Sequence, residues 1–458
     1  MGQYQSIKVK PLSSLLAIKY MHLRGMKMQT FFKKSFIGFL LLSLFALLAA
    51  CGGGEGASGK ETTDGNKNSE GKTGTGGTLE ISVQSDYIEY VNEIIPAFEE
   101  EHGVTVNVIE RDMSEALDAL PLDGPSGLGP DILIAPYDRI AIFGQQGHLA
   151  EVTLPDDGRY DELDHQQVTV DGKSYGYPMM IESLVLYYNK DLLDEPPATF
   201  DDLEALTNDE RYALESEPGT STAFLVNWLD FYYAYGLFSG FGAYVFGNNG
   251  TDPTDIGLNT PEAVEAIEYI AHWYQNIWPQ GMLDASTAYN FVDERFITGK
   301  AAAVITGPWS EYGYRDAGVN FGVSTIPKLP NGENYKPFAG GKGWIISNYS
   351  ENKDLAVKFL EYVTNVENQT FLHELKGEVP ANQIVRQEVA NSGDELAKAV
   401  IEQYNSSVPM PNIPEMAEVW PAAQTMIFDV ASGNKDARQS ADDAVELIKQ
   451  NIEQKYNN

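Results

Sequence analysis

The sequence predicts an α/β fold, in which helices pack against sheets that contain parallel strands. Three observations support this prediction. A strand-helix-strand pattern follows residue 78. Two short apolar runs, at 131–135 and 301–307, have the composition of strands that are buried on both faces. The chain has 458 residues, of which 43% are hydrophobic, and is therefore long enough to bury several packed layers.

The first elements form a β-α-β unit. LEISV at 79–83 alternates apolar and polar residues, as a half-buried strand does. The segment 88–101 carries apolar residues at spacings of three and four, which predicts a helix. Gly103 follows where a helix C-cap belongs, and VTVNVI at 104–109 alternates again. The run DILIA at 131–135 then supplies the next strand.

Later elements repeat this theme. Thr260 and Pro261 form an N-cap and first-turn pair that predicts a helix start. AAAVITG at 301–307 is expected to be another buried strand. Ser440 and Asp443 have the spacing of a capping box, which predicts that the last helix begins there.

The first fifty residues are expected to be a secretory signal. Residues 36–50 form a run of fifteen apolar or small residues, preceded by Lys33 and Lys34. A transmembrane helix needs about 20 apolar residues, so this run suits the core of a signal peptide better. Residues 1–26 precede this signal and are expected to be an over-extended start, because Met26 or Met28 would be the more usual place to begin.

Cys51 is the only cysteine in the chain, so an internal disulfide is excluded. It follows Leu-Ala-Ala, a sequence that resembles the lipobox of bacterial lipoproteins. That resemblance implies cleavage before Cys51 and attachment of a lipid to its thiol. The segment 51–77 is rich in glycine and is expected to be a tether, with an r.m.s. reach of about 28 Å.

Charge and motifs exclude several functions. The formal net charge is −35 and becomes −42 without residues 1–50, so nucleic acid is an unfavourable partner. The sequence lacks the patterns of a zinc protease, a P-loop and a serine-hydrolase elbow. We therefore expect no catalytic residue, no metal and no cofactor. A glycosidase-like pair of carboxylates stays open, because acidic residues are abundant.

Four blocks of sequence resemble the maltose/maltodextrin-binding proteins of bacterial ABC importers, which are extracellular solute-binding proteins of family 1. The blocks are 129–152, 171–203, 294–309 and 410–420. The second is the most specific, since it combines a Tyr-Pro step, a Glu and the run Tyr-Asn-Lys-Asp-Leu-Leu. The resemblance implies a two-lobed periplasmic-binding-protein-like fold of type II. Each lobe would be a mixed sheet flanked by helices, with the ligand in a cleft between the lobes.

The resemblance also implies lobe boundaries. Lobe one would comprise 78–182 and 342–390, and lobe two would comprise 183–341 and 391–458. The chain would cross between the lobes near 181–187 and again near 337–343, and would return near 390. Closure about these crossings would bury a bound sugar.

Sugar recognition needs aromatic faces for the C–H faces of pyranose rings and charged groups for pairs of hydroxyls. The positions that match the family's polar ligand contacts are Asp86, Asp138, Arg139, Glu182 and Asp230. The positions that match its stacking residues are Tyr232, Trp309 and Trp420. Each has a structural alternative: a loop salt bridge for the Asp138–Arg139 pair, a core position for the tryptophans, and a hinge support for Glu182.

Four positions depart from the family pattern. Members often carry Lys where Tyr87 stands, Trp at Ala135, Tyr at Pro421 and Arg at Gln424. Loss of an aromatic wall at 135 is expected to reshape one subsite. These departures leave the sugar's length and linkage open, not its class.

The resemblance therefore implies a lipid-anchored receptor on the extracellular face of the cell membrane, or on the periplasmic side if the cell has two membranes. It would be a monomer that delivers maltodextrin-like oligosaccharides to the permease subunits of an ABC transporter. A cyclodextrin, a β-linked glycan or another oligosaccharide is the alternative ligand. A surface hydrolase of starch fragments and a sensory or adhesion subunit are alternatives from other classes.

Overall fold

The computed structural model describes residues 77–456, and the α/β class is confirmed within this range. The predictions for residues 1–76, including the signal segment, the lipid on Cys51 and nearly all of the tether, lie outside the described residues. In the described part of the chain, no helix combines the length and apolarity that a membrane crossing requires.

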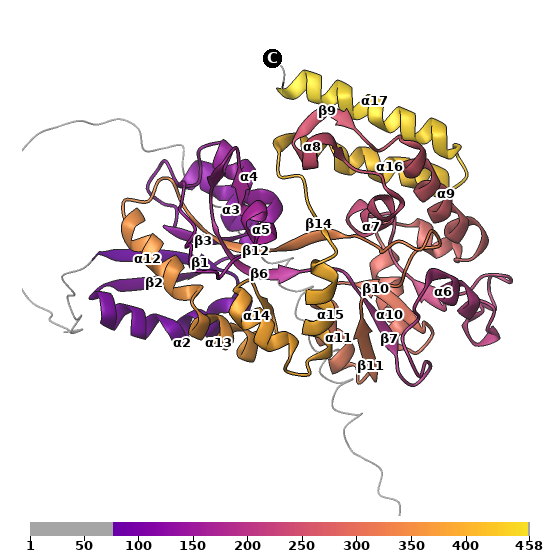
Figure 1. The fold of residues 1–458 in the computed structure, drawn as a ribbon, viewed down its shortest axis with the longest axis horizontal. Helices are drawn as coiled ribbons and strands as arrows, with labels where there is room; N and C mark the ends of the chain where they lie inside the picture. Colours follow the sequence, from indigo (N-terminus) through magenta and orange to yellow (C-terminus); the bar gives the residue numbers. More distant parts are fainter. Residues whose placement is uncertain (1–76, 457–458) are drawn as a thin grey trace, which may run out of the picture. The chain divides into compact units, whose positions relative to one another are not determined.

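The larger sheet contains seven strands (Figure 1). Its main path runs β13 (Val379–Pro380), β6 (Tyr177–Glu182), β12 (Phe338–Ile346), β3 (Ile132–Pro136), β1 (Thr78–Val83) and β2 (Thr105–Glu110), and β14 (Val408–Pro409) pairs with β12. Strands β2, β1 and β3 are parallel, as a β-α-β start requires. Strand β12 is antiparallel to both β3 and β6, so the sheet is mixed.

Helices cover both faces of this sheet. One layer consists of α2 (Ser85–His102), α12 (Lys353–Val363) and α13 (Val366–Lys376), and the other of α3 (Met113–Asp123), α4 (Tyr137–Gln145) and α5 (Glu162–Val168) (Figure 1). Helix α2 ends as the sequence predicts. Gly103 has a left-handed φ of 65°, and its N–H donates to the Glu99 carbonyl.

The smaller sheet contains four strands in the order β11 (Phe321–Ser324), β7 (Val185–Asn189), β10 (Ala303–Thr306) and β8 (Phe224–Leu225). The chain enters it directly from the larger sheet, because β6 ends at Glu182 and β7 begins at Val185. This short step falls within the predicted crossing at 181–187. The lobe boundaries stay a prediction.

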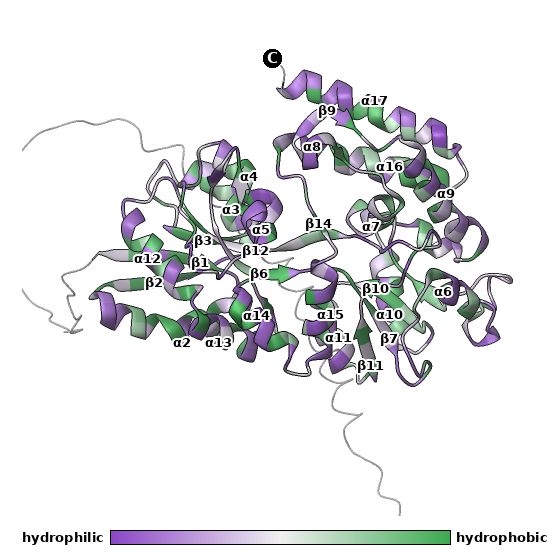
Figure 2. Ribbon diagram, in the orientation of Figure 1, coloured by the Kyte–Doolittle hydropathy of each residue, from purple (hydrophilic) through white to green (hydrophobic). Residues whose placement is uncertain are grey.

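The remaining helices of the described range are α6 (Phe200–Leu206), α7 (Phe231–Phe241), α8 (Gly247–Gly250), α9 (Pro261–Asn276), α10 (Ala288–Ile297), α11 (Glu311–Asp316), α14 (Gln383–Ala390), α15 (Glu395–Tyr404), α16 (Val419–Ala431) and α17 (Ala437–Tyr456). Short strands complete the fold: β4 (Thr169–Val170), β5 (Lys173–Ser174) and β9 (Asp252–Ile256). Four 3₁₀ turns lie at Glu210–Tyr212, Gln280–Leu283, Pro308–Ser310 and Pro414–Glu418. Figure 2 shows α2 and α17 banded with hydrophobic and hydrophilic residues, as helices with one buried face should be.

Two predicted helix starts have different outcomes. Thr260 caps α9 as expected, since its hydroxyl accepts from the Ala263 N–H at 3.2 Å. The predicted start of the last helix at Ser440 is wrong, because α17 begins at Ala437. Asp436 accepts from the Gln439 N–H at 2.9 Å in the capping role, and the buried Ser440 hydroxyl instead donates to the Met426 carbonyl on α16.

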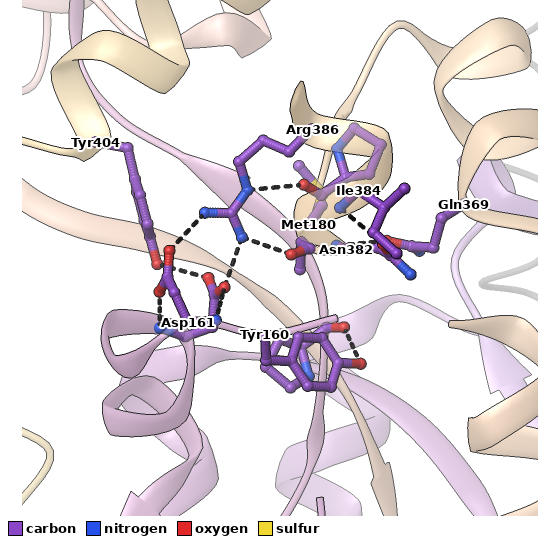
Figure 3. A network of polar contacts seen from close by, with 12 residues as sticks. Tyr160, Asp161, Met180, Gln369, Asn382, Ile384, Arg386 and Tyr404 are labelled. Carbon is purple, nitrogen blue, oxygen red and sulfur yellow. Dashed lines mark hydrogen bonds and ion pairs between the residues drawn. The ribbon is translucent and has the colours of Figure 1, made fainter. Parts of the chain in front are cut away.

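A buried ionic network joins α5, α14 and α15 (Figure 3). The Arg386 guanidinium of α14 donates to Asp164 at 2.6 Å and to Asp161 at 3.2 Å. It also lies against the ring of Tyr404 on α15, with 5.6 Å to the ring centroid. Since α15 also contacts β7 and β11, this network links the helices of the larger sheet to an element that packs on the smaller one.

Candidate functional site

A pocket of about 550 Å³ lies where β1 and β6 end. We call it the charged pocket, and its lining residues are Gln84, Asp86, Tyr87, Met180, Ile181, Glu182, Pro308, Trp309, Glu311, Tyr312, Lys342, Lys376, Gly377, Glu378, Val379 and Leu396. The carboxyl ends of parallel strands are a common place for ligand sites in α/β folds. Three of the predicted residues meet here: Asp86, Glu182 and Trp309.

The charge in this pocket is organised around Lys342, which points from the central strand β12. Its ammonium lies 2.8 Å from Glu182. Burial by itself would lower the pKa of Lys342, but Glu182 and Glu378 outweigh burial, and the net direction is upward. Lys342 is therefore a cation held beside carboxylates in a site that is poorly exposed to water.

Glu378 is the second buried carboxyl of the pocket. It accepts from the Tyr87 hydroxyl at 2.8 Å. Burial raises the pKa of Glu378, and the nearby Lys342 partly opposes this rise. Tyr87 stands where family members often carry a Lys, so this structure replaces a cation by a phenol that donates a hydrogen bond.

A second hollow of about 420 Å³ adjoins the first, and we call it the aromatic pocket. Its lining residues are Asn227, Tyr232, Tyr233, Tyr289, Val292, Asp293, Ile305, Thr306, Trp309 and Ser310. Trp309 lines both pockets, and half of its surface is exposed, which is unusual for an indole. Such a face is available for stacking.

Asn227 in the aromatic pocket is buried, and neither polar atom of its side chain makes a hydrogen bond of good geometry among residues 77–456, although the Tyr289 hydroxyl lies close enough to interact with it. Buried amides are rarely left unpaired, because desolvation without a hydrogen bond is costly. The amide is therefore available to a polar ligand or to water in this pocket.

Asp230 and Tyr232 begin α7. Asp230 caps the helix by accepting from the Tyr232 N–H at 2.9 Å, and it also accepts from the hydroxyl of Tyr289. The Tyr232 ring lines the aromatic pocket, and burial raises its pKa well above the usual value, with Glu182 as the next cause. Asp230 therefore fixes the start of α7 and orients the side chain of Tyr289 through its hydrogen bonds.

The two side chains of the predicted pair, Asp138 and Arg139, have different surroundings in this structure. Burial raises the pKa of Asp138, against the opposing charge of Arg139. The Arg139 guanidinium turns to Asp118 of α3 at 2.5 Å and covers the ring of Phe143. Neither residue lines the charged or the aromatic pocket.

Trp420 of α16 is half-buried, and its ring lies edge-on to Phe231 and Phe338, with 6.0 Å between centroids in each case. It lines neither pocket, and neither do the departures Pro421 and Gln424 on the same helix. Ala135 is fully buried in β3.

Together, the two pockets offer carboxylates, the ammonium groups of Lys342 and Lys376, and an exposed indole at one place. This set can accept and donate hydrogen bonds to several hydroxyl groups while covering an apolar ring face. In the described range no group of three or more His, Cys, Asp or Glu side chains could hold a metal ion. A larger cavity of about 790 Å³, lined in part by Tyr235, Tyr244 and Lys336, includes none of the predicted site residues.

Comparisons with known proteins agree with this reading of the fold. Residues 93–400 match the family model of bacterial extracellular solute-binding proteins. The maltodextrin-binding protein MdxE of Bacillus subtilis is 50% identical over 91% of this chain and 99% of its own length. A maltooligosaccharide ABC transporter solute-binding lipoprotein of Streptococcus pneumoniae is 46% identical over 82% of this chain and 89% of its own.

A solved structure extends this similarity to three dimensions. The maltose-binding periplasmic protein of Listeria monocytogenes, in complex with maltose, superimposes with a TM-score of 0.81. It is 55% identical and covers 83% of this chain and 99% of its own.

Proposed function

The chain belongs to the bacterial extracellular solute-binding proteins, and on that premise we propose that it captures maltodextrin-type oligosaccharides for an ABC importer. The observation that carries the proposal is the position of Trp309. Its half-exposed indole separates a pocket of charged groups from a pocket of aromatic ones, which is the pair of chemistries that a glucan requires. The relatives named above bind maltodextrin, maltooligosaccharide or maltose.

The proposed contacts differ in role. Asp86 and Glu182 accept hydrogen bonds from sugar hydroxyls, and Trp309 and Tyr232 stack on ring faces. Asp230 acts beside them by holding Tyr289. Asp138, Arg139 and Trp420 would reach the ligand only after a rearrangement, and for Arg139 this means release from Asp118.

The same proposal includes location and partners. A lipid on Cys51 anchors the protein at the outer face of the cell membrane, or at the periplasmic side in a cell with two membranes. The monomer carries its ligand to the permease subunits of the transporter. It binds without covalent chemistry, because only closure around the ligand is needed to change its affinity for the permease.

Calorimetric titration of residues 77–458 tests the ligand. Maltotriose, maltoheptaose and a cyclodextrin are expected to give saturable heats, whereas cellotriose should give none. Binding of cellotriose alone would replace the α-glucan by a β-linked glycan. Shorter products after incubation with maltoheptaose would establish hydrolysis and overturn the assignment as a binding protein.

A further inference from the structure

We propose that the turn between α3 and β3 rests on the lipid surface to which the protein is anchored, so that the charged pocket faces away from the membrane. The segment 121–130, which comprises the last three residues of α3 and the turn that follows them, is called the apolar turn below. The inference depends on the lipid anchor in the proposed function, but not on the identity of the sugar.

The apolar turn exposes large side chains that soluble proteins normally cover. Leu122 is 79% exposed and Leu128 is 76% exposed. The Leu128 N–H donates to the Asp123 carbonyl at 3.0 Å, which brings the two ends of the turn together. The neighbours Pro121 and Pro125 are exposed as well. These side chains form an apolar projection that water solvates poorly.

The apolar turn also carries almost no net charge. Asp123 is its only charged residue, and Arg111 neutralises it at 3.1 Å. The whole chain has a net charge of −35. An anionic lipid surface repels an acidic protein, so close approach is easiest where acidic side chains are missing or paired. An anionic lipid surface should therefore repel this turn less than it repels most of the protein surface.

The apolar turn lies at the edge of the larger sheet where the described chain begins. Strands β1 and β3 are parallel, so Thr78, which starts β1, and Asp131, which precedes the first residue of β3, lie at the same edge. The Asp131 carboxylate accepts from the Glu80 N–H at 2.9 Å, directly across this edge.

A second contact fixes the same placement. A side-chain carbon at Gly124 would fall 2.1 Å from the Tyr349 ring, so the apolar turn packs on that residue. Three residues later, the Asn352 amide donates to the Thr78 carbonyl at 3.0 Å. One short segment, 349–352, thus touches both the apolar turn and the start of β1.

The short connection between Cys51 and Thr78 favours this edge of the sheet as the part that contacts the membrane. Only residues 52–77 separate Cys51 from Thr78. A short connection keeps the nearest part of the protein surface at a high effective concentration beside the membrane. Even a weak apolar contact between that part and the lipid is then populated. Two exposed leucines supply such a contact.

The arrangement has a consequence for capture. The charged pocket lies at the other end of β1, since Gln84, Asp86 and Tyr87 follow the last residue of that strand. A contact through the apolar turn would therefore present the pocket to the outside, where sugars arrive, and the protein would leave this contact and turn over to deliver its sugar to the permease.

Site-specific fluorescence on the full-length lipidated protein tests the proposal. With Cys51 acylated, Ser126→Cys supplies the only free thiol, for an environment-sensitive dye in the apolar turn. Ser216→Cys, another exposed serine, is the matched position elsewhere. Both proteins are placed on vesicles of phosphatidylglycerol and phosphatidylethanolamine that contain nitroxide-labelled lipid. Quenching is expected to be several-fold stronger at 126 than at 216.

The leucines are tested in the same assay. Leu122→Ser with Leu128→Ser should reduce quenching at 126 to the level at 216, while Leu447→Ser, which also removes an exposed leucine, should not. Equal quenching at both positions, or quenching that survives loss of both leucines, would overturn the proposal. Cross-linking of position 126 to a permease or to a second copy, without quenching, would assign the turn to that partner instead.

The outcomes separate this inference from the proposed function. Flotation with the vesicles reports on the anchor alone. Titration with maltotriose reports on the sugar site alone, and the leucine variants should leave that affinity unchanged.

Discussion

Lys342 is the residue on which the electrostatics of the charged pocket depend. It lies between glycines in β12, with 16% of its side chain exposed and Glu182 at 2.8 Å. Removing one partner of a buried ion pair leaves the other charge without compensation. The loss of one partner should therefore lower both the free energy of unfolding and the affinity for the ligand.

We therefore expect Lys342→Met to lower the free energy of unfolding by about 3 kcal/mol and to weaken maltodextrin binding at least tenfold. Lys336→Met is the matched control. That lysine lies 3.6 Å from Glu333 at the surface, and its loss should cost less than about 1 kcal/mol. Urea unfolding and calorimetry measure the two effects. Equal losses of unfolding free energy in the two variants would show that the buried ion pair contributes no more than the surface pair.

The two tryptophans that were predicted to stack should behave differently. Trp309 is half exposed, so Trp309→Ala should weaken sugar binding by about 2 kcal/mol, roughly thirtyfold, and leave unfolding almost unchanged. Trp420 packs edge-on to Phe231 and Phe338, so Trp420→Ala should also lower the free energy of unfolding by about 2 kcal/mol. Thermal unfolding with calorimetry distinguishes them. A strongly destabilised Trp309→Ala would contradict the stacking role.

The sequence could predict part of this site and not the rest. Asp86, Glu182 and Trp309 belong to motifs that resemble the family, and they meet in one pocket. Lys342 and Glu378 were missed, because a lysine between glycines and a glutamate after a helix look like ordinary surface residues. Their burial arises from contacts between segments far apart in the chain, such as the Tyr87–Glu378 hydrogen bond.

At the scale of elements, Arg386 and its two carboxylates hold α5, α14 and α15 together (Figure 3). Burial raises the pKa of Asp164 to about 6, although Arg386 opposes the rise. In the folded state the Asp164 carboxyl therefore keeps its proton to a higher pH than it does in the unfolded chain. The pKa of an Asp in the unfolded chain is about 3.9. The stability that this group contributes is complete below about pH 4 and is lost as the pH rises through 6.

Asp164→Asn, which mimics the protonated side chain, makes this testable. Between pH 4 and pH 7.5 the wild type should lose up to about 3 kcal/mol of unfolding free energy relative to the variant. Urea titrations at both pH values give the difference directly, and other carboxyls cancel because both proteins carry them. A difference that changes in the opposite direction would mean that the ion pair with Arg386 outweighs burial.

Element boundaries show why local patterns are sufficient in some places and not in others. The β-α-β start and the cap at Thr260 were predicted correctly, since alternation and capping act within a few residues. The start of α17 was predicted three residues too late. Asp436 caps it, and Ser440 bonds to α16, a tertiary contact that the local sequence does not specify.

At the scale of the whole molecule, the strand order explains how one ligand can act on the protein. The two sheets are joined at the step from Glu182 to Val185, beside the charged pocket. Trp309 follows β10 of the smaller sheet, whereas Asp86 follows β1 of the larger. If a sugar touches both, as we propose, it would be bound more tightly when the two sheets approach, and this difference in affinity would shift the population toward a closed form.

Maltotriose should therefore compact and stabilise the protein together. At a concentration of one hundred times Kd, binding to the folded state alone adds about 2.7 kcal/mol to the free energy of unfolding. X-ray scattering should show a smaller radius of gyration under the same conditions. Trp309→Ala at the same sugar concentration should show a smaller response in both measurements, because its occupancy is lower. Stabilisation without compaction would mean that the sugar binds to one sheet's residues only, and that closure is not what the permease recognises.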